Sequence, residues 1–334
     1  MSATIFIDGE HGTTGLQIRT RLEGRTDVEL LSLAVDDRRD INMRREMLNE
    51  ADLVILCLPD DAARESVSMI QNPNVKVVDA STAHRVADDW VYGMPEYDAE
   101  QRERIAQANR VSNPGCYAVA SVALLHPLEV SGLLPHDFPV TINAISGYSG
   151  GGKSMIAEFE DPNDDSYTEV PFRVYGMKLE HKHVPEITKW SGLSERPLFV
   201  PSVGRYHKGM IVQVPLQLWA LPQMPTPKDL QETLEKHYDG CRYVTVESFE
   251  DVDNIALLMP EELNDTNELR LYVFGNEERG QAILVGLLDN LGKGASGQAV
   301  QNMNIMLGLP EEAGLSEGSN RAWMKETVPG SKAG

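Results

Sequence analysis

Short apolar runs alternate with helical segments over the first third of the chain. The strand-like runs are residues 4–8, 28–33, 52–58 and 75–79, and the helical segments between them include residues 16–22 and 60–70. The run at 52–58 is almost wholly apolar, which is typical of a central strand covered on both faces. Repetition of strand and helix in this way predicts an α/β fold with a doubly wound parallel sheet.

A glycine-rich turn joins the first predicted strand to the first predicted helix. It contains Gly9, Gly12, Thr13, Thr14 and Gly15. A strand, a glycine turn and a helix in this order form the context that a dinucleotide-binding loop requires, with the pyrophosphate resting on the helix N-terminus. The spacing is G-x-x-G-x-x-G, with Glu10 where the common form has glycine, so an ordinary glycine turn explains the pattern equally well.

The ends of two further strands carry candidate cofactor contacts. After residues 28–33, Asp36 and Asp37 could hold a ribose 2′-hydroxyl, whereas Arg38 and Arg39 could hold a 2′-phosphate. The residues alone leave NAD and NADP open, and all four could be solvated loop charges. Ser81 follows residues 75–79, where ligands of parallel sheets collect, although a helix cap or turn would also explain it.

The pattern changes from about residue 118. Longer, more alternating strands are predicted at 140–146, 211–218, 244–249, 269–276 and 281–288, with a helix at 226–238. This favours a second, α+β domain with a mostly antiparallel or mixed sheet. We therefore expect a dinucleotide-binding domain over residues 1–117 and a catalytic and oligomerisation domain over residues 118–292. A helix with an apolar stripe follows at 293–307, and the tail beyond Gly314 is polar.

One cysteine stands at the start of a predicted helix. In Ser112-Asn113-Pro114-Gly115-Cys116-Tyr117 a Pro-Gly turn places Cys116 before an apolar segment that extends to Leu125. Free N–H groups and the helix dipole favour a thiolate there, which is the nucleophilic form. A small buried structural residue is the alternative, since free cysteine is usually buried and inert.

A nucleophilic cysteine needs a base elsewhere in the chain. The segment His181-Lys182-His183-Val184-Pro185-Glu186 supplies one. If a helix begins here, His183 and Glu186 share a face, so that the carboxylate could orient the imidazole. The two histidines and the glutamate could instead bind a metal, but zinc would require further ligands, and we expect no metal site.

A third glycine-rich segment matches a different motif. Residues 147–154 satisfy G-x-x-x-x-G-K-S, the phosphate-binding loop of ATPases and kinases. The acidic, proline-containing sequence soon after Lys153 argues against the stable helix that such a loop needs, and a complete strand–helix array precedes it. Lys153 could still meet an anionic substrate, and the alternative is a flexible glycine loop with a solvated lysine.

Composition narrows the class of partner. Of the 334 residues 41% are hydrophobic, and the net charge is −21. Such a charge argues against nucleic acid and anionic membranes, which require clustered Lys and Arg. No apolar run is long enough to cross a membrane, and three widely separated cysteines do not suggest disulfides. We expect a cytoplasmic protein that acts on a small molecule.

Several of these motifs together resemble one enzyme family. They are Gly9-x-x-Gly12-x-x-Gly15, Tyr92-Gly93-Met94-Pro95-Glu96, Ser112 to Tyr117, His181 to Ile187 and Asp289 to Ala299. In this combination and order the chain is similar to the N-acetyl-gamma-glutamyl-phosphate reductase family, in its shorter bacterial form. Three other functions remain as alternatives. The first is another acyl-phosphate reductase, such as aspartate-semialdehyde dehydrogenase. The others are the ATPase considered above and a nucleotide sensor without enzymatic activity.

The resemblance implies a Rossmann domain, joined by the C-terminal helical segment 293–334, and a domain like that of aspartate-semialdehyde dehydrogenase. It implies NADPH-dependent reduction of N-acetyl-glutamyl 5-phosphate in arginine synthesis by a homo-oligomer, a dimer or tetramer. Cys116 would be the nucleophile, His183 the acid and base, and Glu186 its support. Asn290 would lie at the nicotinamide, and the substrate contacts would include Asn113, Lys153, Arg205 and Lys208.

Overall fold

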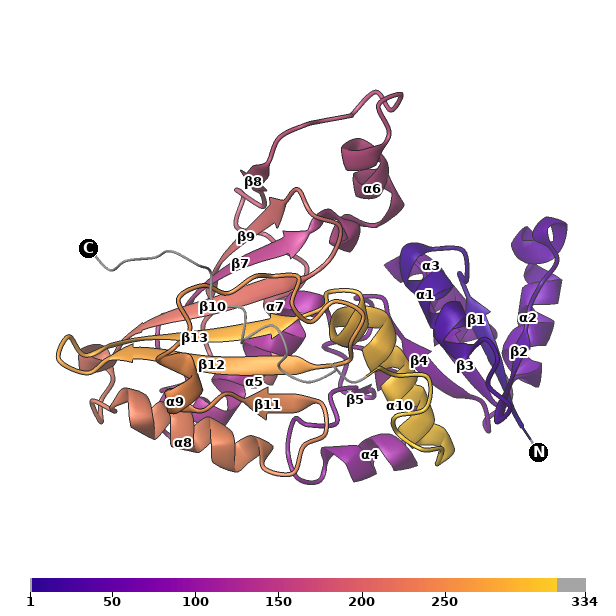
Figure 1. Ribbon diagram of the computed structural model, residues 1–334. Helices are drawn as coiled ribbons and strands as arrows, with labels where there is room; N and C mark the ends of the chain where they lie inside the picture. The colour runs from indigo at the N-terminus through magenta and orange to yellow at the C-terminus, as the bar shows by residue number, and fades with distance from the viewer. Residues whose placement is uncertain (1, 317–334) are drawn as a thin grey trace.

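The computed structural model describes residues 2–316 and contains two β-sheets that lie side by side (Figure 1). Sheet A comprises β1 (Ala3–Asp8), β2 (Val28–Leu31), β3 (Leu53–Leu56), β4 (Lys76–Asp79), β5 (Val91–Tyr92) and β6 (Arg110–Ser112). The order is β2-β1-β3-β4-β6-β5, and every pair is parallel. The predicted parallel sheet is confirmed.

Helices cover both faces of sheet A. On one face α1 (Thr13–Leu22), α4 (Gln101–Gln107) and α10 (Gly297–Leu307) share an apolar cluster with β1 and β3. On the other face α2 (Ile41–Glu50) and α3 (Asp60–Met69) pack against the same strands. A short 3-10 turn, η1 (Val35–Arg39), precedes α2. The chain is therefore doubly wound, as predicted.

The glycine turn lies where the strand order of sheet A reverses. Strand β1 has β2 on one side and β3 on the other, and ligands bind outside the carboxyl ends of strands at such a point. Gly9 has a φ of +90°, and a Cβ there would lie 2.4 Å from the carbonyl oxygen of Cys57. A Cβ on Gly15 would lie 2.5 Å from the carbonyl oxygen of Gly9. Packing therefore requires glycine at both positions.

Sheet B is mixed, as predicted. Its strands are β7 (Thr141–Gly147), β8 (Phe172–Val174), β9 (Leu198–Gly204), β10 (Met210–Gln217), β11 (Val244–Val246), β12 (Leu269–Asn276) and β13 (Gln281–Leu288). The order is β11-β12-β13-β10-β7-β9-β8. The pairs β7–β9 and β11–β12 are parallel and the other pairs are antiparallel.

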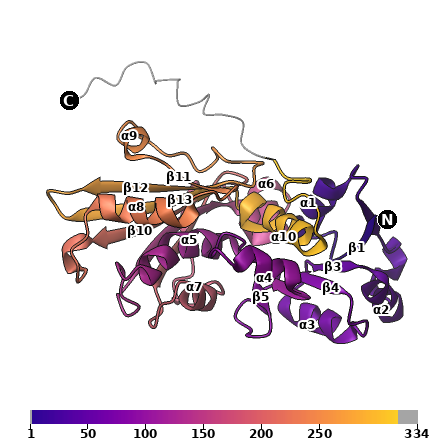
Figure 2. The ribbon, with the colours of Figure 1, turned by 90° about the horizontal axis from the view of Figure 1, so that it is seen from below.

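One face of sheet B packs on helix α5 (Cys116–Val130), whose residues from Tyr117 to Leu128 are all buried. Helices α7 (Val184–Trp190) and α8 (Pro227–Tyr238) enclose α5 in the same apolar cluster. The remaining elements of this part are α6 (Gly152–Glu160), α9 (Phe249–Val252) and the turns η2 (Tyr148–Gly151) and η3 (Leu218–Ala220). Figure 2 shows α5 and α9 on opposite sides of the strands. The packing of α5 fixes its first residue between the sheets.

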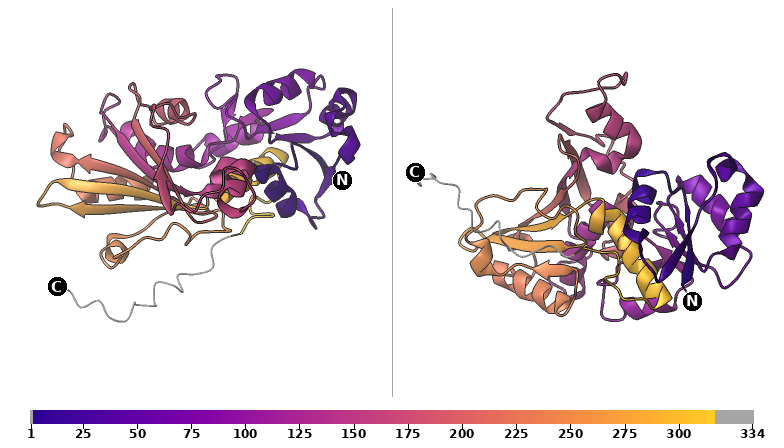
Figure 3. Two further views of the ribbon diagram at one scale, coloured as in Figure 1. Left: turned by 90° about the horizontal axis from the view of Figure 1, so that it is seen from above. Right: turned by 45° about the vertical axis from the view of Figure 1, so that its right-hand side comes forward.

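The end of the described chain returns to sheet A. A π-helical turn, η4 (Gly292–Ser296), leads into α10, which Figure 3 shows against the N-terminal part of the molecule. Helix α10 ends at Leu307 because Gly308 is left-handed, with a φ of +66°. A helix over the whole of 293–334 is therefore wrong, and residues 317–334 lie outside the described part. Within residues 2–316 the helices all lack the length and apolar character needed to span a bilayer.

Candidate active site

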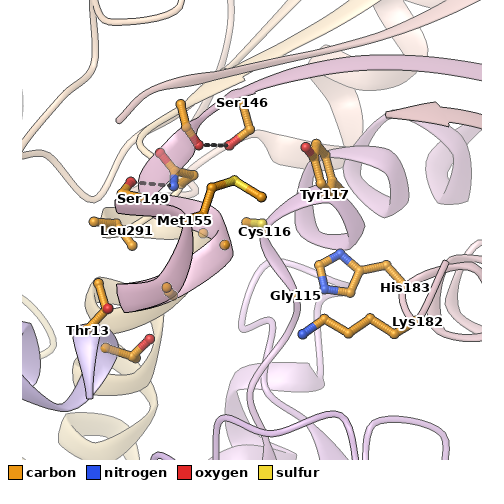
Figure 4. Close-up of a pocket in the computed structure, with 18 of the residues that line it drawn as sticks. Thr13, Gly115, Cys116, Tyr117, Ser146, Ser149, Met155, Lys182, His183 and Leu291 are labelled. Atoms are coloured by element: carbon orange, nitrogen blue, oxygen red, sulfur yellow. Dashed lines mark hydrogen bonds between the residues drawn. The ribbon is translucent and has the colours of Figure 1, made fainter. Parts of the chain in front are cut away.

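A cavity of about 320 Å³ lies where the two sheets meet. Its lining combines the start of α1, the start of α5, the loop from β7 to α6, the segment before α7 and the π-turn η4. Figure 4 shows the sulfur of Cys116 near its centre, with Met155 and Ser149 on one side and Tyr117 and His183 on the other. Segments remote in sequence thus converge on the cysteine.

Cys116 is the first residue of α5, and its N-cap is Gly115. Burial raises the pKa of the Cys116 thiol to about 11, and the charges of Arg85 and Lys182 offset only part of this effect. The shift runs opposite to the one that the helix N-terminus and the nearby cations favour, because desolvation outweighs them. A neutral thiol must lose its proton as it reacts.

His183 lies next to the N-cap of α5. A Cβ on Gly115 would lie 2.5 Å from His183 Nε2 and 2.5 Å from Arg85 Nη1, so both groups converge on this glycine. Burial, and then the charge of Arg85, lower the pKa of His183 well below its usual value. The imidazole is therefore neutral at pH 7 and can accept a proton. Its Nδ1 has no hydrogen-bond partner among the described residues.

Glu186 does not hold His183, contrary to our expectation. Its Oε1 accepts hydrogen bonds from the Gly115 N–H (2.9 Å) and the Tyr92 hydroxyl (3.0 Å). Its Oε2 accepts from Arg85 Nη1 at 3.2 Å. His183 is the N-cap of α7 and so precedes the helical face that carries Glu186. The carboxylate fixes the backbone before Cys116 and leaves His183 without a carboxylate partner.

Arg85 is a cavity residue that the sequence reasoning missed. It comes from the loop after β4 and is 7% exposed. Its guanidinium donates to the carbonyl oxygens of Asn113 (2.9 Å) and Ala80 (3.0 Å), as well as to Glu186. Arg85 thus ties the end of β4 to the segment before Cys116. Its position six residues after Asp79, at the carboxyl end of a central strand, was the available signal.

The two predicted asparagines both line the cavity. Asn113 donates from Nδ2 to the Ala295 carbonyl at 3.1 Å and so holds the π-turn beside Cys116. Asn290 accepts from the Gly209 N–H at 2.7 Å and donates to Ser149 Oγ at 3.1 Å. Both amide side chains are buried, and these bonds fix their orientation.

The glycine turn presents the start of α1 to the same cavity. Thr13 and Thr14 line the cavity. The N-cap of α1 is Gly12, which has no side chain, so no N-cap side chain bonds the first N–H groups of the helix. Behind the turn lies a second cavity of about 350 Å³, lined by residues that include Gly9, Gly12 and Arg38. A bound dinucleotide could reach from one cavity to the other along the turn.

Arg38, which lines the second cavity, is suited to bind a phosphate group in addition to the pyrophosphate of a dinucleotide. Arg38 Nε is buried without a hydrogen-bond partner among the described residues, and its Nη2 lies 3.7 Å from Glu10 Oε1. Glu10 itself is held by Arg19 at 2.7 Å, which explains how a carboxylate is tolerated in the turn. The unpartnered donor matches the 2′-phosphate of NADP. The side chain of Arg39 is not among those described.

Four other predicted contacts lie away from the cavity lining. Ser81 is bonded to Asp79 through both its N–H and its hydroxyl. Arg205 donates to the carbonyls of Thr168 and Phe159. Lys208 pairs with Asp265, and Lys153 is exposed on α6. The structure brings none of Ser81, Lys153, Arg205 and Lys208 to the lining of the main cavity within residues 2–316.

Two comparisons define the class of protein. A family model described as "Semialdehyde dehydrogenase, NAD binding domain" matches residues 5–108, and one described as "Semialdehyde dehydrogenase, dimerisation domain" matches residues 116–290. The fold is that of aspartate semialdehyde dehydrogenase II from Vibrio cholerae, with a TM-score of 0.66 at 15% identity over 92% of this chain and 99% of that one. The Candida albicans enzyme, solved with NADP, gives a TM-score of 0.60 at 14% identity, again over 92% and 99%. The chain therefore belongs to the semialdehyde dehydrogenase class of oxidoreductases and has that class's NAD-binding domain.

Curated relatives narrow the class to one family. N-acetyl-gamma-glutamyl-phosphate reductase 2 of Pseudomonas putida is 52% identical over 93% of this chain and 98% of its own length. N-acetyl-gamma-glutamyl-phosphate reductase of Chelativorans sp. is 54% identical over 92% and 99%. The chain belongs to the N-acetyl-gamma-glutamyl-phosphate reductase family.

Proposed function

We propose that this chain reduces N-acetyl-glutamyl 5-phosphate to N-acetyl-glutamate 5-semialdehyde and phosphate with NADPH, as a step of arginine synthesis, through a thioester on Cys116. The names of the relatives support the substrate. The covalent route is supported by the position of the sulfur, which opens a helix inside the cavity that the glycine turn also reaches. An acyl phosphate suits this route because phosphate is a good leaving group.

In the first half of the reaction Cys116 Sγ attacks the acyl carbon. The S–H proton passes to neutral His183, the sulfur–carbon bond forms, and the bond from carbon to the phosphate oxygen breaks with its electron pair going to phosphate. His183 then passes the proton to that phosphate, so that the imidazole is neutral again. Backbone N–H groups at the start of α5 would stabilise the developing oxyanion.

In the second half NADPH, when bound, supplies the hydride that reduces the thioester carbon. His183, after taking up a proton from solvent, gives it to the substrate oxygen, takes it back when the carbon–sulfur bond breaks, and passes it to the departing sulfur. The thiol is thereby restored and the aldehyde leaves. Gly115 lets the imidazole stay close to the reacting sulfur, since any Cβ there would displace it.

Residues of the glycine turn would hold the cofactor. Gly9, Gly12 and Gly15 allow its backbone to approach closely, and Thr13 and Thr14 lie at the helix start that faces the pyrophosphate. Arg38 would hold the 2′-phosphate, and Asn290 would border the nicotinamide from the side of sheet B. We place Asn113 at the substrate, where Arg85 and the π-turn fix its orientation.

The assembly and its location are part of the same proposal. The second family model is described as a dimerisation domain, which supports a homo-oligomer, a dimer or tetramer. The cytoplasm, where arginine synthesis has its substrates and NADPH, is the proposed location.

The single observation that carries the proposal is the convergence of His183 and Arg85 on the residue before Cys116. The reverse reaction tests it, with N-acetyl-glutamate semialdehyde, phosphate and NADP⁺, by the absorbance of NADPH at increasing enzyme concentration. Phosphate-dependent formation of NADPH is expected. No formation with this aldehyde, but formation with aspartate semialdehyde, would contradict the substrate and leave the class intact.

A further inference from the structure

The main cavity contains two permanent cations and no carboxylate among the described residues that line it. The cations are Arg85 and Lys182. The two histidines of the lining do not add to this charge at pH 7. Burial lowers the pKa of His181 to about 4 and that of His183 well below its usual value. In a chain with a net charge of −21, this cavity is therefore locally positive and suits an anion.

The two cations differ in burial and in how many of their N–H donors already bond to other residues of the protein. Arg85 is 7% exposed, faces Glu186 at 3.2 Å, and also donates to two backbone carbonyls. Glu186 therefore balances the charge of Arg85, and the N–H groups of its guanidinium already have acceptors. Lys182 is exposed, and its ammonium makes no hydrogen bond or close ion pair with a residue of 2–316, although its charge also acts on the Asp60 carboxylate. Lys182 therefore keeps its charge and its three donors for a ligand.

The ammonium of Lys182 lies near the reacting atoms. Figure 4 shows it beside the ring of His183, on the side toward Gly115. Its charge acts on the Cys116 sulfur in the same direction as that of Arg85. Of the two cations that act on the sulfur, Lys182 is the exposed one and Arg85 the buried one.

The substrate carries two anionic groups at different distances from the sulfur. The phosphate is attached to the carbon that Cys116 attacks, so it must lie within a few bonds of Sγ. The carboxylate is separated from that carbon by the rest of the glutamyl chain. A cation that acts directly on the sulfur therefore lies nearer the phosphate. A flexible ammonium can also follow the phosphate as it leaves, which the fixed fork of Arg85 cannot do.

We propose that Lys182 is the phosphate-contact residue of this site, and that its ammonium holds the phosphate while Cys116 is acylated and, in reverse, while phosphate attacks the thioester. The proposal rests on the proposed function. The three basic residues expected to contact the substrate, Lys153, Arg205 and Lys208, are not among the residues that line the cavity.

The reverse reaction separates phosphate from aldehyde. In Lys182→Met the KM for phosphate should rise about tenfold or more, the loss of one charge-assisted hydrogen bond. The KM values for N-acetyl-glutamate semialdehyde and NADP⁺ should stay within about twofold, since neither contact is removed. Lys182→Arg should restore most of the phosphate affinity. Lys178→Met, an exposed lysine outside the cavity, is the matched control and should leave all three values unchanged.

A second measurement does not depend on the identity of the substrate. Inorganic phosphate should slow the alkylation of Cys116 by iodoacetamide in the unaltered protein and in Lys178→Met, but not in Lys182→Met, at constant ionic strength. Protection without turnover of the aldehyde would support Lys182 and contradict the proposed substrate. An unchanged KM for phosphate with unchanged protection in Lys182→Met would overturn the proposal, as would a rise in the aldehyde KM alone.

Discussion

Two helices begin at the same cavity, and their first turns do different things. Helix α1 follows Gly12 and α5 follows Gly115, and both N-caps are glycines in extended conformation without a side-chain cap. The start of α1 is half-buried and carries two threonines. The start of α5 is enclosed by Arg85, Glu186 and His183, and the Gly115 N–H is already bonded to Glu186.

The difference teaches that a helix N-terminus does not by itself decide what binds there. At α1 the N–H groups remain available to an anion. At α5 burial raises the pKa of Cys116 to about 11 in spite of the helix and the cations. The first end is suited to binding a cofactor, and the second to generating charge only while the reaction proceeds.

The largest effect should come from removing the nucleophile at α5. Cys116→Ser should lower turnover by about 10⁴-fold or more, because a serine hydroxyl holds its proton more tightly than a thiol. NADPH binding, followed by its fluorescence, should survive, since α1 is untouched. Retention of more than a tenth of the activity would remove the distinction between the two helix ends.

His183→Asn comes next. Its loss should lower the rate by between about 100-fold and 10⁴-fold, the usual contribution of a general acid and base. Because the pKa of His183 is lowered, the neutral base persists below pH 6.5, and kcat/KM of the unaltered enzyme should not fall on the acid side through loss of this base until well below that pH. A fall in kcat/KM on the acid side with a midpoint at pH 6.5 would mean that another residue is the base or that His183 is exposed to water.

Alkylation tests the protonation of the thiol directly. A thiol pKa of about 11 means that the thiolate fraction grows tenfold per pH unit below that value. Iodoacetamide labelling of Cys116 should therefore accelerate about 100-fold between pH 7 and pH 9. Labelling of the Cys116→Ser variant corrects for Cys57 and Cys241. A rate that is already level at pH 7 would show that the helix N-terminus prevails over burial.

A crossed pair of glycine substitutions should give the smallest but most discriminating effects. Gly15→Ala places a Cβ 2.5 Å from the Gly9 carbonyl oxygen, and should weaken NADPH binding about tenfold without changing alkylation of Cys116. Gly115→Ala places one 2.5 Å from His183 Nε2, and should lower kcat with NADPH binding intact. If Gly15→Ala and Gly115→Ala changed NADPH binding and kcat alike, the two helix ends would not have separate functions.

Local patterns predicted most of the elements. The predicted strands at 269–276 and 281–288 have the bounds of β12 and β13, and the Pro-Gly turn placed the start of α5 at Cys116. Helix α2 was missed, although the Asp40 side chain caps it by accepting from Asn42 and Met43. Helix α6 does form and begins at Gly152, which weakens one argument against a phosphate-binding loop, but Lys153 is not among the residues that line the cavity.

The site was less predictable because its partners are distant in the chain. Glu186 was assigned to His183 by their spacing, yet its actual partners come from residues 85, 92 and 115. The thiolate was expected from one helix end, whereas the pKa depends on everything packed around the sulfur. Arg85 and Lys182 could be placed only once both sheets were in position.

The π-turn between β13 and α10 restricts how the wall of the cavity beside Cys116 can move. Gly294 lies against Cys116, where a Cβ would come within 2.8 Å of the cysteine Cβ, while Arg21 of α1 donates to Ser296 at 3.1 Å. Lys293, fully enclosed, is anchored to Glu96 at 2.8 Å. One side of the cleft is thus clamped to both halves of the protein. Any movement that widens the cavity must therefore leave this wall in place or break these contacts.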